Sequence, residues 1–241
     1  MKKQIKNILF VLAVATTLVN SQIVAGFQRD FNATTPSTGW RYLWNASGAS
    51  GDLTSNPIGN PAAYSSLLSD GTYYTPDGDS NLTNNAPSDY LVLGPQGGHL
   101  TNDSAAPDVR RYMIFEYTIQ TTGFYNIQDS YVQNAAAAFG QKDVGFRLNS
   151  GPRIASLTVG TGAYDPVTNP GGRVTFDSNL GALNAGDKLY LELGSIGSNS
   201  GSSFNMDYNI VAVPEPSTYA MIFGSVLLGI LVIRKKRIQS A

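Results

Sequence analysis

The sequence contains no cysteine and a single histidine, His99. The absence of cysteine excludes disulfides, thiolate metal sites and a cysteine nucleophile. One histidine excludes multi-histidine metal sites, and any Ser-His-Asp triad would have to include His99. No Gly-x-Ser-x-Gly nucleophile motif is present. The sequence therefore favours a protein that is not an enzyme, stabilised by packing or by bound ions.

Glutamate is also scarce, because most of the 17 acidic residues are aspartate. Aspartate favours turns and calcium sites over helix surfaces, so few helices are expected. The formal net charge of −1 hides a segregation, since seven of the 16 basic residues lie near the two ends of the chain. Without those ends, nine basic residues face 16 acidic ones, a net charge of about −7. This charge argues against a nucleic-acid partner.

The amino terminus has the three parts of a secretory signal peptide. Residues 1–7 are basic, residues 8–19 form an apolar run of 12, and a stretch of mainly polar and small residues follows as far as Gly26. The apolar run is too short to span a bilayer. We therefore expect residues 1–26 to be a signal peptide that signal peptidase removes after Ala25 or Gly26, and the sequence does not choose between these bonds.

The carboxyl terminus combines a short apolar span with a basic tail. Residues 218–233 are mostly apolar and would be about 24 Å long as a helix, against roughly 30 Å of hydrocarbon. The positive-inside rule keeps the basic cluster in the cytoplasm and the preceding domain outside. We expect a transmembrane helix at 218–233 and a cytoplasmic tail at 234–241, whose basic cluster is Arg234, Lys235, Lys236 and Arg237.

A linker at residues 212–217 precedes that span and contains Pro214, Glu215 and Pro216. Followed by the short span and the basic tail, residues 214–220 (PEPSTYA) resemble the PEP-CTERM sorting signal of Gram-negative bacteria that make exopolysaccharide. The resemblance implies that an exosortase in the inner membrane recognises Pro-Glu-Pro and removes the helix, so that membrane anchoring is transient. The protein would then reach the cell surface or the extracellular matrix. A simple single-pass tail anchor is the alternative.

The segment between the two ends, residues 27–211, reads as strands separated by turns. Its roughly 185 residues fit one domain, and the predicted strands are rich in aromatic and β-branched residues. The spacing predicts an all-β fold, a single antiparallel β-sandwich of jelly-roll type. The expected strands lie at 111–119, 123–132, 144–148, 154–159, 188–193 and 204–211. Residues 61–68 are expected to contain a turn of helix.

Short motifs along this segment also resemble the jelly-roll domain of other PEP-CTERM proteins, which is similar to galactose-binding-like carbohydrate modules. This resemblance implies a carbohydrate-module fold. Its landmarks are Gly39–Tyr42, Gly98–His99, Arg110, Gly123–Tyr125, Asp143–Val144, Leu183–Asp187, Gly194 and Asp207.

Three aromatic residues, Trp40, Tyr42 and Trp44, alternate along one predicted strand. Their side chains would share one face, and a row of aromatic rings can stack on the apolar face of a sugar. The same pattern is typical of an inter-sheet core, and we regard the core as the stronger interpretation. Glycan binding by these residues is the alternative.

The loop from Asp77 to Asn81 begins like a calcium-binding loop. Asp77, Asp79 and Asn81 place oxygen side chains at positions 1, 3 and 5. The continuation departs from an EF-hand, because Leu82 stands at position 6 and Ser88 at position 12. Two interpretations remain open. The loop is either part of a Ca²⁺ site that a distant carboxylate completes, or an ordinary turn.

Together these features predict an exported surface or matrix protein that is structural or binds glycan in association with exopolysaccharide. The alternative is a secreted hydrolase that acts on polysaccharide. A hydrolase would need a pair of carboxylates, and Glu116 and Glu192 both lie in apolar runs where the sequence shows no partner for them. A recessed carboxylate pair in a cleft would favour the hydrolase.

Overall fold

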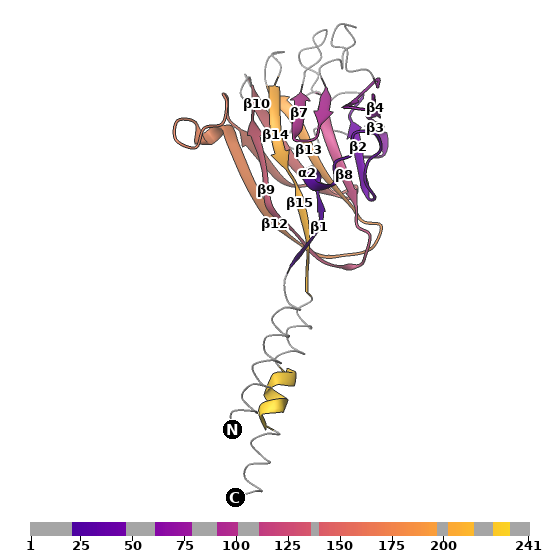
Figure 1. The fold of residues 1–241 in the computed structure, drawn as a ribbon, viewed down its shortest axis with the longest axis vertical. Helices are drawn as coiled ribbons and strands as arrows, with labels where there is room; N and C mark the ends of the chain where they lie inside the picture. The colour runs from indigo at the N-terminus through magenta and orange to yellow at the C-terminus, as the bar shows by residue number, and fades with distance from the viewer. Residues whose placement is uncertain are drawn as a thin grey trace, which may run out of the picture.

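A computed structural model of the chain describes residues 21–46, 61–78, 91–100, 111–135, 140–196, 202–214 and 224–231 (Figure 1). Most of these residues belong to strands of two antiparallel sheets. The remaining described elements are the short helix α2 (Phe27–Asp30), the helical residues 224–231, and two 3₁₀ turns, η1 (Pro61–Ala63) and η2 (Pro170–Gly172). The predicted all-β, antiparallel fold is confirmed, and so is the turn of helix expected within 61–68.

The larger sheet contains nine strands in the order β1-β15-β9-β14-β7-β6-β5-β4, and β12 pairs with β9. The long strand β9 is central, because it pairs with β12 along one edge and with β14 and β15 along the other. The strands are β1 (Gln22–Gly26), β4 (Leu68–Ser69), β5 (Tyr74–Thr75), β6 (Val92–Gly94), β7 (Gly97–Leu100), β9 (Gly123–Asn134), β12 (Arg173–Leu183), β14 (Ser202–Asp207) and β15 (Asn209–Val213).

The smaller sheet contains six strands in the order β11-β10-β13-β8-β2-β3. Its strands are β2 (Trp40–Trp44), β3 (Ser65–Ser66), β8 (Tyr112–Thr118), β10 (Gln141–Leu148), β11 (Arg153–Val159) and β13 (Lys188–Ile196). Because side chains alternate between the two faces of a strand, β8 directs Met113, Phe115 and Tyr117 into the core between the sheets. The residues between them lie on the outer face of this sheet.

The core is strongly aromatic around α2. Phe27 is fully buried and makes edge-to-face contacts with Phe31, Trp40, Tyr42 and Phe115, with ring centroids 5.1 to 6.5 Å apart. Such contacts add to the free energy gained by burying the rings themselves. Residue 27, the first residue after the predicted signal peptide, therefore lies at the centre of the packing.

The sandwich extends beyond the predicted 27–211 segment at both ends. Strand β1 lies within the stretch assigned to the signal peptide, and it pairs with β15, which continues to Val213. Figure 1 shows these two strands at the same end of the sandwich. Residues 1–20 lie outside the described part of the chain, so the rest of the predicted signal peptide has no structural account.

Residues 224–231, within the predicted membrane span, are helical, and their leucine and isoleucine side chains are exposed. In the ranges that the structure describes, no helix is both long enough and apolar enough to cross a membrane.

Candidate functional site

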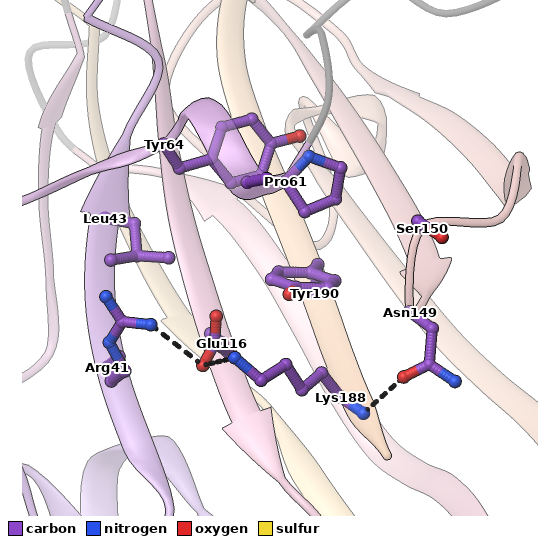
Figure 2. A pocket seen from close by; sticks show the side chains of 10 residues that line it. Arg41, Leu43, Pro61, Tyr64, Glu116, Asn149, Ser150, Lys188 and Tyr190 are labelled. Atoms are coloured by element: carbon purple, nitrogen blue, oxygen red, sulfur yellow. Dashed lines mark hydrogen bonds and ion pairs between the residues drawn. The ribbon is translucent and has the colours of Figure 1, made fainter. Parts of the chain in front are cut away.

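A hollow of about 340 Å³ opens on the outer face of the six-stranded sheet (Figure 2). Strands β2, β8 and β13 form its floor, and the segment around η1 and the turn after β10 form its walls. The side chains around it are mostly polar. They belong to Arg41, Leu43, Pro61, Ala62, Tyr64, Glu116, Asn149, Ser150, Lys188 and Tyr190.

The floor carries a row of three charged side chains from adjacent strands. Arg41 lies opposite Glu116 in the β2–β8 register, and its Nη1 is 3.4 Å from Glu116 Oε1. Lys188 Nζ approaches the same oxygen at 3.0 Å. Glu116 is almost fully buried, whereas the Arg41 side chain is half exposed and that of Lys188 is 39% exposed. The two cations therefore face solvent over a carboxylate that fixes their positions.

The turn after β10 supplies the amide on one wall. Asn149 adopts a left-handed φ of 52°, which asparagine tolerates better than most residues. Its Oδ1 accepts a hydrogen bond from the backbone N–H of Lys188 at 2.8 Å, and its Nδ2 donates to Asp187 Oδ1 at 3.0 Å. These bonds hold the turn against β13 and place Asn149 and Ser150 at the rim.

Two tyrosines meet in the hollow, Tyr64 beside η1 and Tyr190 on the floor strand β13 (Figure 2). The rings of Tyr64 and Tyr190 meet edge to face, with centroids 6.1 Å apart. Burial, and then the neighbouring Glu116, raise the pKa of Tyr190 to about 12. Burial and the neighbouring Glu192 also raise the pKa of Tyr64. Both hydroxyls therefore stay protonated at physiological pH, and that of Tyr64 donates its proton to Glu192 Oε1 at 2.9 Å.

A buried ionic network lies beside the hollow on the same face. Glu192 is fully buried and accepts from Arg147 Nε at 2.9 Å, from Arg153 Nε at 2.8 Å and from the Tyr64 hydroxyl at 2.9 Å. Arg153 Nη1 also donates to Asp143 Oδ2 at 2.7 Å. Burial disfavours the charged guanidinium of Arg153, but the two carboxylates more than offset this effect and raise its pKa.

Glycine makes room for this network. Gly145 faces Glu192 across the β10–β13 pairing, and a Cβ at residue 145 would lie 2.2 Å from Arg153 Nε. The missing side chain lets the Arg153 guanidinium lie across the sheet and reach both acids. The network ties Tyr64, and with it one wall of the hollow, to the sheet.

This arrangement suits binding better than acid–base chemistry. Glu116 is the carboxylate in the hollow, and two cations bind it. Glu192 is inaccessible, and both of its oxygens accept hydrogen bonds from guanidinium groups. The accessible groups are a guanidinium, an ammonium, an amide and hydroxyls, which are donors and acceptors for a polar ligand.

Residues 212–237 match the family model of the PEP-CTERM protein-sorting motif. The chain carries a PEP-CTERM sorting signal. This signal indicates an exported protein and implies processing by an exosortase. Pro214 directly follows β15, whereas Glu215, Pro216 and the basic cluster at 234–237 lie outside the described residues.

The sandwich is similar to several solved structures. TmCBM61 in complex with beta-1,4-galactotriose has 10% identity and a TM-score of 0.35, over 78% of this chain and 94% of that chain. The cleaved adhesin domain K3 of Lys-gingipain from Porphyromonas gingivalis has 11% identity and a TM-score of 0.34, over 79% and 99%. A family 35 carbohydrate binding module from Clostridium thermocellum has 18% identity and a TM-score of 0.26, over 44% and 72%. No curated protein matches the sequence.

Trp40 and Tyr42 lie in the core, as the stronger interpretation of the aromatic strand predicts, and not on the alternative glycan platform. Trp40 and Tyr42 are buried in the core, at 4% and 2% exposure, and cannot offer a stacking surface. Trp44 is partly buried against the same core, and the Arg111 guanidinium lies over its ring, 5.7 Å from the centroid. The strand alternates as expected, but its aromatic face points inward and the face with Arg41 points outward.

The calcium prediction stays a prediction. Asp79 and Asn81 lie outside the described residues, and Asp77 accepts a hydrogen bond from the Thr75 hydroxyl at 3.2 Å. Within the described ranges, no three histidine, aspartate or glutamate side chains are grouped to hold a metal ion.

His99 lies on β7 and lines a second hollow of about 410 Å³ with Tyr73 and three glycines of the nine-stranded sheet.

The hollow itself was not predicted from the sequence. Arg41 stands between Trp40 and Tyr42, and a charged residue between two large aromatics on a strand signals a solvent-facing side. That signal was available. The contacts of Arg41 with Glu116 and of Glu192 with two arginines depend on pairing between distant strands, which one sequence does not reveal.

Proposed function

We propose that this protein is an exported component of the cell surface or extracellular matrix that binds glycan in the hollow on the six-stranded sheet. The sorting signal supports export, and the association of such signals with exopolysaccharide producers supports a glycan partner. The observation that carries the proposal is the row of Arg41, Glu116 and Lys188 beside the rings of Tyr64 and Tyr190. The hydroxyls of a sugar form hydrogen bonds with such fixed donors and acceptors, and a tyrosine ring can pack against the apolar face of the sugar ring.

The charge of the hollow favours an acidic glycan. Arg41 and Lys188 contribute two positive charges and Glu116 one negative charge, so the hollow is net positive although the domain as a whole is acidic. Guanidinium groups bind carboxylates through two parallel hydrogen bonds. We expect uronate-containing polysaccharide fragments to bind more tightly than neutral ones.

A matched pair of variants tests this proposal. Arg41 and Arg29 each pair with one acid, and each side chain is 51% exposed, but Arg29 lies on α2 away from the hollow. Titration calorimetry with uronate oligosaccharides should show about tenfold weaker binding for Arg41→Ala, the loss of one charge-assisted contact. Arg29→Ala should bind like the parent protein. Equal affinities for both variants would refute the site.

One observation favours a second function, a hydrolase of polysaccharide. Glu116 and Glu192 share the outer face on adjacent strands, and paired carboxylates carry out glycoside hydrolysis. The burial of Glu192 and its two arginine partners oppose this role. Release of reducing sugar that disappears in Glu116→Gln would establish the hydrolase, whereas binding without release supports the glycan-binding component.

Exosortase processing predicts that the mature protein lacks the tail. Intact-mass measurement of the native surface protein should show that residues 234–237 are absent. If the mature protein retains these residues, the chain is a simple tail-anchored surface protein and not an exosortase substrate.

A further inference from the structure

We infer that signal peptidase cuts this chain between Ser21 and Gln22, so that the mature protein keeps strand β1. This inference rests on the proposed export, because an exported chain is the one that meets signal peptidase. It replaces the two bonds expected from the sequence, those after Ala25 and Gly26.

Strand β1 is an integral part of the nine-stranded sheet. Gln22 pairs with Ala212, Ile23 with Val211 and Ala25 with Ile210 of β15. Without β1, strand β15 would become the edge of the sheet, with unpaired backbone groups beside buried apolar residues. A cut after Ala25 or Gly26 removes this strand almost completely.

Side chains of the same segment also belong to the fold. Ala25 has no exposed surface, and Val24 packs against the core. The carbonyl of Ile23 accepts a hydrogen bond from Arg29 Nη1 at 3.1 Å. The burial of this segment increases from Gln22 to Phe27, as expected for a chain that enters a domain from solvent.

The later cuts also change the charge of a buried region. A cut after Gly26 would place a terminal ammonium on Phe27, whose side chain is fully buried and whose backbone N–H donates to Tyr208 O at 3.0 Å. Burying an ammonium is costly, and a nearby carboxylate oxygen, Asp207 Oδ1, accepts from the next backbone N–H, that of Gln28, at 3.2 Å. A cut after Ala25 would place it on Gly26, where Asp30 could pair with it, so the lost strand is the argument against that bond.

The bond after Ser21 avoids both problems. Ser21 and Gln22 are exposed, so a terminal ammonium on Gln22 would stay in water. Signal peptidase needs a small residue before the cut, and Ser21 meets this requirement as well as Ala25 and Gly26 do. The sequence therefore permits all three bonds, and the structure distinguishes them.

The two ends of the domain are then arranged alike. Strand β1 begins at Gln22, opposite Ala212, and β15 ends at Val213, immediately before Pro214 of the sorting motif. The β1–β15 ladder lies at one end of the sandwich (Figure 1). One cut before β1 and one after β15 remove the signal peptide and the sorting signal and leave the folded domain whole.

Mass spectrometry of the amino-terminal peptide of the exported full chain, produced in a Gram-negative host, tests the inference. We expect it to begin at Gln22, including any fraction cyclised to pyroglutamate with loss of ammonia. A peptide that begins at Gly26 or Phe27 would overturn the inference and leave export intact. A chain that still begins at Met1 would overturn both the inference and the signal peptide on which export depends.

Two leucine substitutions provide a matched check that does not depend on folding, because signal peptidase acts on the unfolded chain. Ser21→Leu should accumulate as unprocessed precursor, whereas Ala25→Leu should be processed at the parent bond. The reverse pattern would place the cut after Ala25 and overturn the inference.

Discussion

Two adjacent residues of β2 test the assignment of its two faces. Trp40 points into the core, where its ring lies 5.1 Å from Tyr117 and 6.0 Å from Tyr208 between centroids. Its indole Nε1 donates to Asp30 Oδ2 at 3.4 Å. Arg41 points outward, and its ion pair with Glu116 is the contact that truncation would remove.

Truncation of Trp40 to alanine should lower the free energy of unfolding by about 3 to 5 kcal/mol, the range for large aromatics removed from a core. In a domain of this size, each kcal/mol lowers the melting temperature by about 2 to 4 °C, so we expect a decrease of about 6 to 20 °C. Arg41→Ala should cost at most about 1 kcal/mol, because its side chain is half exposed and Lys188 still neutralises Glu116.

Urea denaturation followed by tryptophan fluorescence and circular dichroism measures both values, and titration with uronate oligosaccharide gives the affinities. We expect Trp40→Ala to lose stability and Arg41→Ala to lose affinity. If Trp40→Ala keeps the parent's stability and loses glycan binding, the assignment of the two faces is refuted.

Three further predictions concern the buried charges and the calcium loop. Glu192→Ala should cost about 3 to 5 kcal/mol in urea unfolding, since it leaves Arg147 without its buried carboxylate; an unchanged midpoint would contradict the network. Burial lowers the pKa of Lys142 from 10.5 to about 8, so the unfolded chain binds more protons above pH 8. Above about pH 8 the parent should therefore gain stability relative to Lys142→Met, whereas the tyrosines whose pKa values burial raises lower the stability of both proteins alike near pH 10; identical pH profiles of the two proteins would contradict this origin. If the loop at Asp77 binds Ca²⁺, a hundredfold excess over the dissociation constant should stabilise the folded protein by about 2.7 kcal/mol and raise its melting temperature relative to chelator; superimposable curves would remove the calcium prediction.

The sequence predicted the strands of the smaller sheet well, because their residues carry the period-2 pattern and high β-propensity themselves. The predicted strands at 111–119 and 188–193 correspond to β8 and β13. The predicted strand at 204–211 is two strands, β14 and β15. Both pair with β9, but the neighbour on the other side is β7 for β14 and β1 for β15. Strand β12 was missed, since its residues 173–183 mix glycine, serine and asparagine with few apolar residues.

Strand β1 shows why a local pattern can mislead. Its sequence, QIVAG, is apolar and ends in small residues, so it satisfies the rules for a signal-peptide cleavage region as well as those for a strand. The pairing with β15, about 190 residues away, decides between the two readings.

Local sequence patterns are also insufficient to predict the candidate site. A charged residue inside an apolar strand indicates an outward position or a buried partner, and Glu116 and Glu192 turned out to have both features. Which cation binds which acid depends on the order of strands β2, β8, β13, β10 and β11 in the sheet. No spacing along the chain carries that order.

The location of bound glycan is the most direct test of the proposed function. Backbone amide chemical shifts of the mature protein, recorded by NMR during titration with uronate oligosaccharides, should change in β2, β8 and β13 around Arg41, Glu116 and Lys188 and at the turn of Asn149 and Ser150. Shifts that cluster instead around Tyr73 and His99 in the second hollow, or no shifts at saturating oligosaccharide, would contradict glycan binding on the six-stranded sheet.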